Sequence, residues 1–341
     1  MRVALVRELG GPEVLVPAER PDPVAGPDEV VIDVSDVDTL FVETQIRSGA
    51  FRDHFPVVPP YVPGGGIAGT VRTVGEGVDV RWTGRRVVAS LGFTGGYAEQ
   101  AVTPADHLVP VPDGLGLREA AALIHDGVTA AALLEATAPE PGERVLVLGA
   151  SGGMGTLLVQ LVHAAGAHVV AVARGKRKTE LVRELGADDV VDGADAEWAE
   201  HARAALEKAG GPADVVLDGV GGTMGAAAFA LVAEGGRFSA HGAPTGAFAR
   251  IDAEEAARRS VSLRSIADVQ LTDAEHVRLA GHALAEAAAG RLRPVIGQVY
   301  PLEQAAQAHA AIEGRGLLGK VLLSTRKARR AGDPEPPRPR P

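Results

Sequence analysis

The chain has 341 residues, a formal net charge of −10, a hydrophobic fraction of 46% and no cysteine. Its length suggests two domains with sizeable cores, and it holds no apolar run of membrane-spanning length. The missing cysteines exclude disulfides, thiolate zinc sites and cysteine nucleophiles, and the acidic balance argues against general nucleic-acid binding. We therefore expect a cytoplasmic enzyme that contacts neither nucleic acid nor membrane.

The first 125 residues have the pattern of a mainly β domain. Short apolar and β-branched runs are separated by glycine and proline, which favour turns. The expected strands are Val3–Val6, Val30–Val34, Gly69–Val74, Arg86–Ser90 and Ala98–Thr103.

The pattern changes after Asp126, where helical and strand periodicities alternate. The expected helices are 127–138, 154–166, 176–186, 196–209 and 222–233. The expected strands are 145–148, 168–173, 189–191, 214–217 and 236–240. Strands that alternate with helices form a doubly wound parallel sheet, so this part predicts an α/β fold.

The end of the chain is expected to rejoin the first domain. We predict a helix over 273–290, a strand over 297–301, a helix over 302–313 and a strand over 319–323. The resulting boundaries are 1–125 for the mainly β domain, 126–264 for the α/β domain and 265–325 for the return. The segment 326–341 is rich in proline and arginine and should be a disordered tail, either inert or in contact with an anionic partner.

A glycine-rich turn joins the predicted strand 145–148 to the helix after it. The turn contributes Gly149, Ser151, Gly152, Gly153, Met154 and Gly155. Strand, turn and helix in this order place backbone N–H groups and a helix N-terminus, with about half a positive charge, around an anion. The spacing is G-x-x-G-x-x-G rather than G-x-G-x-x-G, but its context predicts a dinucleotide phosphate site.

The residues after the next predicted strand indicate which dinucleotide is bound. NAD-binding folds usually carry an acid about 20 residues after the glycines, where it binds the ribose hydroxyls. This chain has R-G-K-R-K at 174–178 and no acid there. Arg174 and Lys178 can pair with a 2′-phosphate, which favours NADPH as the cofactor. The alternative is that this cluster is only the solvated start of a helix.

Motifs spread over residues 1–324 are similar to those of one enzyme family. They include G-G-P-E-V-L at 10–15, V-G-E-G-V at 74–78, G-G-Y-A-E at 95–99, G-A-S-G-G-M-G at 149–155 and D-V-V-L-D-G-V-G-G at 214–222. In this order and spacing, the chain resembles the zinc-independent medium-chain dehydrogenases/reductases of the quinone oxidoreductase type.

The resemblance implies a GroES-like catalytic domain beside a Rossmann domain, with the active cleft between them. It implies an NADPH-dependent oxidoreductase that transfers hydride to a quinone, enone or enoyl substrate. It also implies a dimer or tetramer, of which we expect the homodimer.

Two positions of the catalytic domain depart from the family pattern. Leu40 replaces an asparagine and Gln45 occupies a tyrosine position, which implies a changed substrate pocket. Gln45 can donate to a carbonyl oxygen in catalysis or be a structural amide. Glu43, at the family's aspartate position, either acts in catalysis or orients a neighbour.

The residues around 125–129 offer further candidates. Thr129, our third candidate catalytic residue, either contacts the nicotinamide or caps the helix. Asp126 stands at the family's glutamine position and is alternatively an N-cap. His125 is either structural or a proton donor, because an ordinary histidine titrates near neutrality.

Two loops of the Rossmann domain complete the candidate cofactor site. The resemblance places Asp218 and Val220 near the riboses, and Gly242 and Ala243 at the nicotinamide. His241 beside them is a possible acid or a packing residue.

Two more positions bear on the cofactor. Gly193 stands where the family often has a tyrosine at the 2′-phosphate, so that phosphate depends on Arg174 and Lys178. Lys320 matches a family lysine that is structural or lies near the pyrophosphate.

The zinc ligands of related dehydrogenases are missing from this chain. Gly64, Gly65 and Gly66 replace their G-H-E motif, and the four-cysteine lobe is absent. We therefore expect no metal. Two alternatives to the reductase stay open, a non-redox nucleotide-binding or sensory protein and a secondary-metabolism tailoring enzyme with a dedicated substrate.

Overall fold

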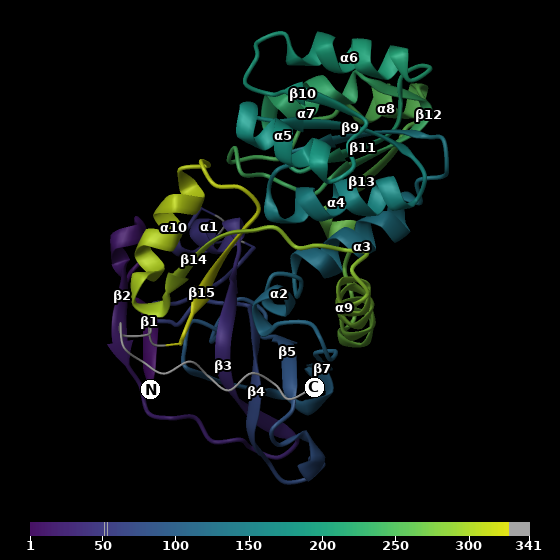
Figure 1. Ribbon diagram of the computed structural model, residues 1–341. Coiled ribbons are helices and arrows are strands. Elements are labelled where there is room, and N and C mark those ends of the chain that lie inside the picture. The colour runs from purple at the N-terminus through teal and green to yellow at the C-terminus, as the bar shows by residue number, and fades with distance from the viewer. Residues whose placement is uncertain (51, 53, 327–341) are drawn as a thin grey trace.

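The computed structural model describes residues 1–50, 52 and 54–326, and it shows two domains, one above the other (Figure 1). The lower domain combines the N-terminal part of the chain with its last strands, and the middle of the chain forms the upper domain. The predicted tail lies outside the described residues from residue 327 onward. Among the residues that the structure describes, no helix is long and apolar enough to span a bilayer.

The upper domain contains a six-stranded parallel sheet with the strand order β10-β9-β8-β11-β12-β13. Its strands are β8 (Arg144–Leu148), β9 (His168–Ala173), β10 (Asp189–Asp192), β11 (Ala213–Asp218), β12 (Val232–Ala240) and β13 (Ser262–Ser265). The helices between them are α4 (Gly153–Ala164), α5 (Lys176–Glu184), α6 (Trp198–Lys208), α7 (Gly222–Phe229) and α8 (Ala253–Arg258). The chain leaves β8 toward β9 on one side and later returns to β11 on the other, so this is the point at which open α/β sheets bind ligands.

Alternate side chains of each central strand enter different cores. On β8, Val145 and Val147 pack on the side of α4 and α5, whereas Leu146 and Leu148 pack on the side of α6 and α7. A parallel sheet that is covered on both faces needs such a continuous apolar strand. The prediction of a doubly wound α/β domain is therefore confirmed.

The lower domain is built on a seven-stranded, mostly antiparallel sheet. Its strands are β3 (Glu29–Thr39), β4 (Gly66–Val74), β5 (Arg86–Ser90), β6 (Gln100–Pro104), β7 (Val109–Pro110), β14 (Ile296–Pro301) and β15 (Lys320–Ser324). The strands β1 (Arg2–Val6) and β2 (Leu15–Glu19) form a separate antiparallel pair. Val321 of β15 pairs with Thr39 of β3, so the end of the chain is part of the sheet that leads into the candidate site.

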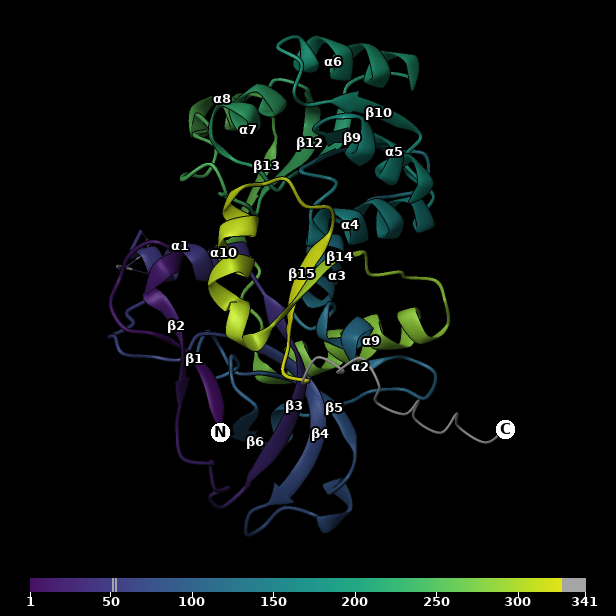
Figure 2. The same cartoon turned by 60° about the vertical axis from the view of Figure 1, so that its left-hand side comes forward.

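The remaining helices lie beside the lower sheet or at the junction of the two domains. They are α1 (Phe41–Ser48), α2 (Leu117–Ala121), α3 (Asp126–Thr137), α9 (Asp273–Ala288) and α10 (Ala305–Glu313). One apolar core runs from the lower sheet through α2 and α3 into the upper domain, with Val88, Val128 and Leu157 among its members. Figure 2 shows β15 extending between the lower sheet and α4, with α10 beside α1. Short 3-10 helices cover Pro12–Val14, Val80–Trp82, Ala105–His107, Ile266–Asp268 and Leu302–Gln304.

The structure corrects several expected elements. The helix expected over 222–233 ends at Phe229, because Val232 already pairs with Ala213 in the parallel sheet. The strand expected over Val30–Val34 continues to Thr39. The sequence did not predict the elements β2, β7, β13, α1, α2 and α8.

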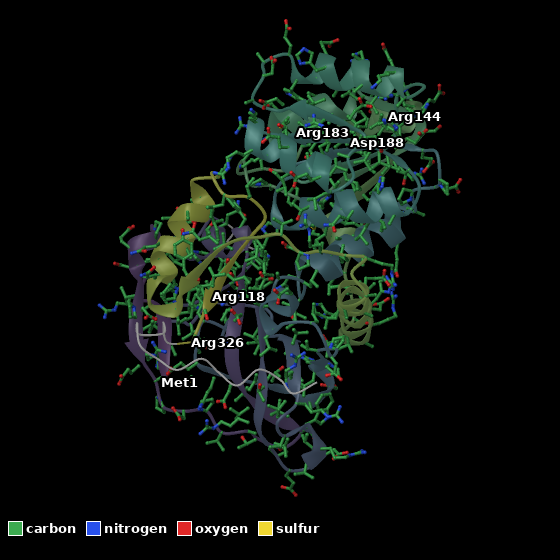
Figure 3. The ribbon with its side chains drawn as sticks, in the orientation of Figure 1. Met1, Arg118, Arg144, Arg183, Asp188 and Arg326 are labelled. Carbon is green, nitrogen blue, oxygen red and sulfur yellow. The ribbon has the colours of Figure 1, made fainter. Side chains whose placement is uncertain are left out.

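The C-terminal end of the described chain is fixed to the lower domain. Arg118 of α2 pairs with Asp36 at 3.0 Å, and Arg326 donates to the Ser35 hydroxyl at 2.8 Å, which in turn donates to Asp36 (Figure 3). Arg326, the first residue of the expected tail, thus holds a defined hydrogen bond.

Candidate functional site

The glycine turn between β8 and α4 has the form of a phosphate cradle. Gly149 adopts a left-handed φ of 69°, and a Cβ at Gly155 would lie 2.3 Å from the Gly149 carbonyl oxygen. Only glycine allows the helix to start this close to the strand. The N-cap residue, Gly152, has no side chain, so no side-chain cap binds the first N–H groups of α4. An uncapped helix start at this position is suited to bind an anion.

The other turn residues join the cradle to the rest of the molecule. A Cβ at Gly153 would lie 2.1 Å from a carboxylate oxygen of Asp126 and 3.0 Å from the side chain of Lys320 on β15, so the lower sheet approaches the helix start closely. The Ser151 carbonyl accepts from the Gly319 N–H at 2.8 Å, and Met154 packs against the apolar core. The cradle is thus held in place by the segment that leads into β15.

The predicted cationic pair lies past the end of β9. Arg174 is exposed, and the Lys178 ammonium donates to the Arg315 carbonyl at 2.7 Å. Burial lowers the pKa of Lys178, and the positive charge of Arg174 makes a smaller contribution in the same direction. Asp192 also lies near Arg174, and the N–H of Gly175 chiefly holds the pKa of Asp192 below its ordinary value. A phosphate here would thus approach two cations and one ionised acid.

The loops after β11 and β12 pack directly on each other. A Cβ at Gly242 would lie 2.3 Å from the Gly219 carbonyl oxygen. Asp218 is buried, and one of its oxygens accepts from the N–H groups of Val220 and Gly221, each at 2.9 Å. Burial raises the pKa of Asp218. The carboxyl group therefore braces its own loop from inside and does not project into the cleft.

The loop after β12 also contacts the catalytic domain. The Gln45 side-chain amide on α1 donates to the Ala243 carbonyl at 3.2 Å. This bond brings a candidate catalytic residue and a candidate nicotinamide-facing residue together across the domain boundary. His241, in contrast, is buried, and burial lowers its pKa to about 4. A neutral, enclosed ring at this position fits the packing role.

Glu43 is fully enclosed at the base of α1, with 1% of its surface exposed. Its carboxyl accepts from the N–H of Leu40 at 2.9 Å, from the N–H of Gly65 at 3.0 Å and from the Tyr97 hydroxyl at 2.8 Å. The same hydroxyl lies 2.9 Å from Nε2 of His309. Burial raises the pKa of Glu43 to about 7. This geometry orients the backbone around Leu40 and Gly65.

A charged cluster fills the junction between the cradle and the lower sheet. The Lys320 ammonium lies 2.6 Å from Asp38 and 2.9 Å from Asp126, and Nδ1 of His125 lies 3.1 Å from the other oxygen of Asp38. Asp38 and Lys320 are 0% and 5% exposed. Burial acts to raise the pKa of Asp38, but Lys320 and His125 outweigh it and hold that pKa below its ordinary value. Burial likewise acts to lower the pKa of Lys320, but the two carboxylates raise it.

This cluster decides whether Asp126 or Thr129 caps the start of α3. Asp126 is the first helical residue and the N-cap is His125, whose side chain makes no capping bond. The N-cap interpretation of Asp126 is therefore wrong, because its carboxylate is committed to Lys320. Thr129 lies one turn into the helix, half-buried, and its N–H donates to the His125 carbonyl, so it is not a cap either.

Sequence reasoning missed several residues that the fold brings to the site. Asp38, Tyr97, His309 and Arg315 come from four separate segments. No local signal singled out Asp38, since Asp33, Ser35 and Asp36 also interrupt the apolar residues of this strand. Its partner Lys320 is 282 positions away, and no local pattern links the two.

Comparisons with known proteins agree with this architecture. A family model described as the alcohol dehydrogenase GroES-like domain matches residues 26–113, and one described as zinc-binding dehydrogenase matches residues 185–323. Together with the two-domain fold and the cradle at the domain junction, they define a medium-chain dehydrogenase/reductase.

The individual relatives indicate which family of medium-chain dehydrogenases/reductases the chain belongs to. The chain is 34% identical to the quinone oxidoreductase of Mus musculus, over 95% of this chain and 97% of the relative. It is 29% identical to the 2-haloacrylate reductase of a Burkholderia species, over 94% of this chain and 98% of the relative. The Escherichia coli quinone oxidoreductase, solved in complex with NADPH, superposes with a TM-score of 0.86 at 26% identity, covering 95% of this chain and 100% of that one. The chain belongs to the quinone oxidoreductase family.

The description of the second family model mentions zinc. Within the described part of the chain, no group of three or more His, Cys, Asp or Glu side chains is placed to hold a metal ion. The expectation that the protein uses no metal stays a prediction.

Proposed function

We propose that this protein is an NADPH-dependent reductase that transfers hydride to a quinone or to a C=C bond conjugated to a carbonyl. The observation that carries the proposal is the uncapped start of α4 at the reversal point of the sheet, with Arg174 and Lys178 beyond the neighbouring strand. The known relatives support it, since one is named for quinones and another for 2-haloacrylate.

The residues present fit the shape and charge of NADPH. The cradle leaves no room for a side chain at Gly155, whereas the nearest atom to a Cβ at Gly152 is 3.4 Å away, so the surface of the cradle is open. We assign the pyrophosphate to the first N–H groups of α4 and the 2′-phosphate to Arg174 and Lys178. We assign the nicotinamide end of the cofactor to the loops that contain Val220, Gly242 and Ala243. Asp218 supports these loops. When bound there, NADPH supplies the hydride.

The lower domain positions the acceptor. One amide hydrogen of Gln45 is donated to the Ala243 carbonyl, and the second can be donated to the carbonyl oxygen of the substrate. Thr129 adds a hydroxyl from α3. Glu43 acts through the backbone of Leu40 and Gly65, since its carboxyl group is enclosed. Fixed donors of this kind stabilise the charge that develops on oxygen as hydride arrives.

The decisive experiment follows NADPH absorbance with the purified protein and a panel of quinones, enones and enoyl thioesters, with NADH in parallel. We expect oxidation that requires both protein and acceptor and that is faster with NADPH. Tight NADPH binding without turnover of any acceptor would favour a dedicated substrate or a non-redox role. No NADPH binding would refute the cofactor assignment.

We also propose a homodimer that forms along the edge of the upper sheet. β13 is the last strand of that sheet, and its Leu263 is exposed. An unpaired strand edge with apolar side chains favours pairing with a second copy. Light scattering of the native chain and of Leu263→Lys should give a dimer and a smaller species respectively, and a native monomer would refute the assignment.

A further inference from the structure

His125 and Asp38 form a hydrogen-bonded pair to which the proposed function assigns no role. His125 ends the segment before α3, with 15% of its side chain exposed, and Nδ1 faces the buried Asp38 carboxylate at 3.1 Å. Among the residues that the structure describes, Nε2 of His125 has no hydrogen-bond partner, and it is not one of the enclosed unpaired atoms. One ring nitrogen is thus fixed and the other is accessible.

The ring packs closely against two glycines of the lower domain. A Cβ at Gly66 would lie 2.6 Å from Nδ1 of His125, and one at Gly65 would lie 3.2 Å from the ring carbon between the nitrogens. Gly65 is the residue whose N–H binds Glu43, which in turn holds Leu40. The next residue, Asp126, touches the cradle at Gly153. His125 therefore stands between the cradle and the wall that we assign to the acceptor.

The His125 ring faces charged and titratable groups from several elements. Asp38 on β3, Asp126 on α3 and Lys320 on β15 together carry one net negative charge when all three are ionised. The His276 ring on α9 lies 6.3 Å away edge to face, and burial lowers its pKa to about 4, so it adds no charge near neutrality. Glu43 on α1 also faces this group of charges.

We propose that His125, oriented by Asp38, is the catalytic proton donor to the acceptor, and this proposal rests on the proposed reductase function. Hydride addition to the electrophilic carbon moves the π electrons of the C=C bond onto the conjugated carbonyl oxygen. The Nε2–H bond of the imidazolium breaks and its proton goes to that oxygen, or equally to the phenolate oxygen of a reduced quinone. The neutral imidazole then takes a proton from water. Asp38 keeps a proton on Nδ1 throughout, so Nε2 is the nitrogen that exchanges.

The kinetic test compares His125→Gln with His276→Gln, a neighbouring histidine without a proposed role. With an enone acceptor, His125→Gln should lower kcat by about 100-fold or more, because a positioned general acid contributes about 10²–10⁴. NADPH affinity, measured by fluorescence, and the KM for the acceptor should stay near native values. His276→Gln should behave like the native protein. Added imidazole should restore turnover to His125→Ala in proportion to its concentration.

A second readout needs neither cofactor nor acceptor. In the cofactor-free protein, ¹⁵N NMR of the histidine rings should show the neutral His125 ring protonated on Nδ1, and Asp38→Asn should change that tautomer or ring exchange rate. Native-like kcat in His125→Gln, or a neutral His125 ring that carries its proton on Nε2 and not on Nδ1, would overturn the proposal while leaving the reductase function intact. If the native protein reduces no acceptor, the reductase function fails and this role fails with it.

Discussion

The enclosed carboxyl group of Glu43 makes protein stability depend on pH in a way that one substitution isolates. Burial raises its pKa to about 7 in the folded protein, against 4.5 for an ordinary glutamate. The folded state therefore binds this proton more tightly than the unfolded chain does. The resulting stabilisation is complete below pH 4.5 and is lost as the pH rises through 7. At about 1.4 kcal/mol per pH unit, the loss is about 3 kcal/mol.

Three histidines, two of them buried and one partly buried, act in the opposite direction. Burial lowers the pKa of His241 and His276 to about 4 and that of His309 to about 3. Their contribution to the free energy of unfolding rises with pH over part of the same range. Total stability is therefore a poor measure of Glu43, but the difference between the native protein and Glu43→Gln removes the histidine contributions.

Urea unfolding of both proteins at steps between pH 4 and pH 8 provides the measurement. The native protein minus Glu43→Gln should lose about 3 kcal/mol between pH 4.5 and 7 and be level above that range. The lost carboxyl contacts add only a constant offset to this curve. Glu8 is exposed, so Glu8→Gln serves as a control and its difference curve should be flat. A flat curve for Glu43→Gln would refute our account of burial at this site.

Three further substitutions test the cofactor site and its support. Gly155→Ala would place a Cβ 2.3 Å from the Gly149 carbonyl oxygen. The substitution should lower the free energy of unfolding by about 1–3 kcal/mol and weaken NADPH binding. Native thermal stability together with native NADPH affinity would contradict the close packing. Arg174→Ala should raise the Kd for NADPH about tenfold and leave that for NADH unchanged, whereas titrations that show equal losses would exclude a 2′-phosphate contact. Lys320→Met leaves two buried carboxylates without their cation, so urea unfolding should show a loss of about 3–5 kcal/mol, and a loss below about 1 kcal/mol would mean that the pair is worth no more than a surface one.

Local pattern was sufficient where the physical cause is local. The apolar run 145–148, the glycines after it and the helical spacing beyond predict strand, turn and helix, and the structure has β8 and α4 there. Backbone dihedral freedom and apolar periodicity act within a few residues, so no distant contact was needed. Element ends were less predictable, as the helix expected over 222–233 shows, because Val232 is drawn into the sheet by its pairing with Ala213.

The sequence by itself therefore determined the fold class, the phosphate cradle and the cationic residues at 174–178. Only the tertiary structure decided which polar groups meet in the cleft. Asp38 and Lys320 are 282 positions apart and lie 2.6 Å apart, and Gln45 reaches Ala243 across the domain boundary. Such contacts arise because buried charges and amides must find partners wherever the packed domains place them. That requirement is met in three dimensions, and for this reason it leaves no periodic signal along the chain.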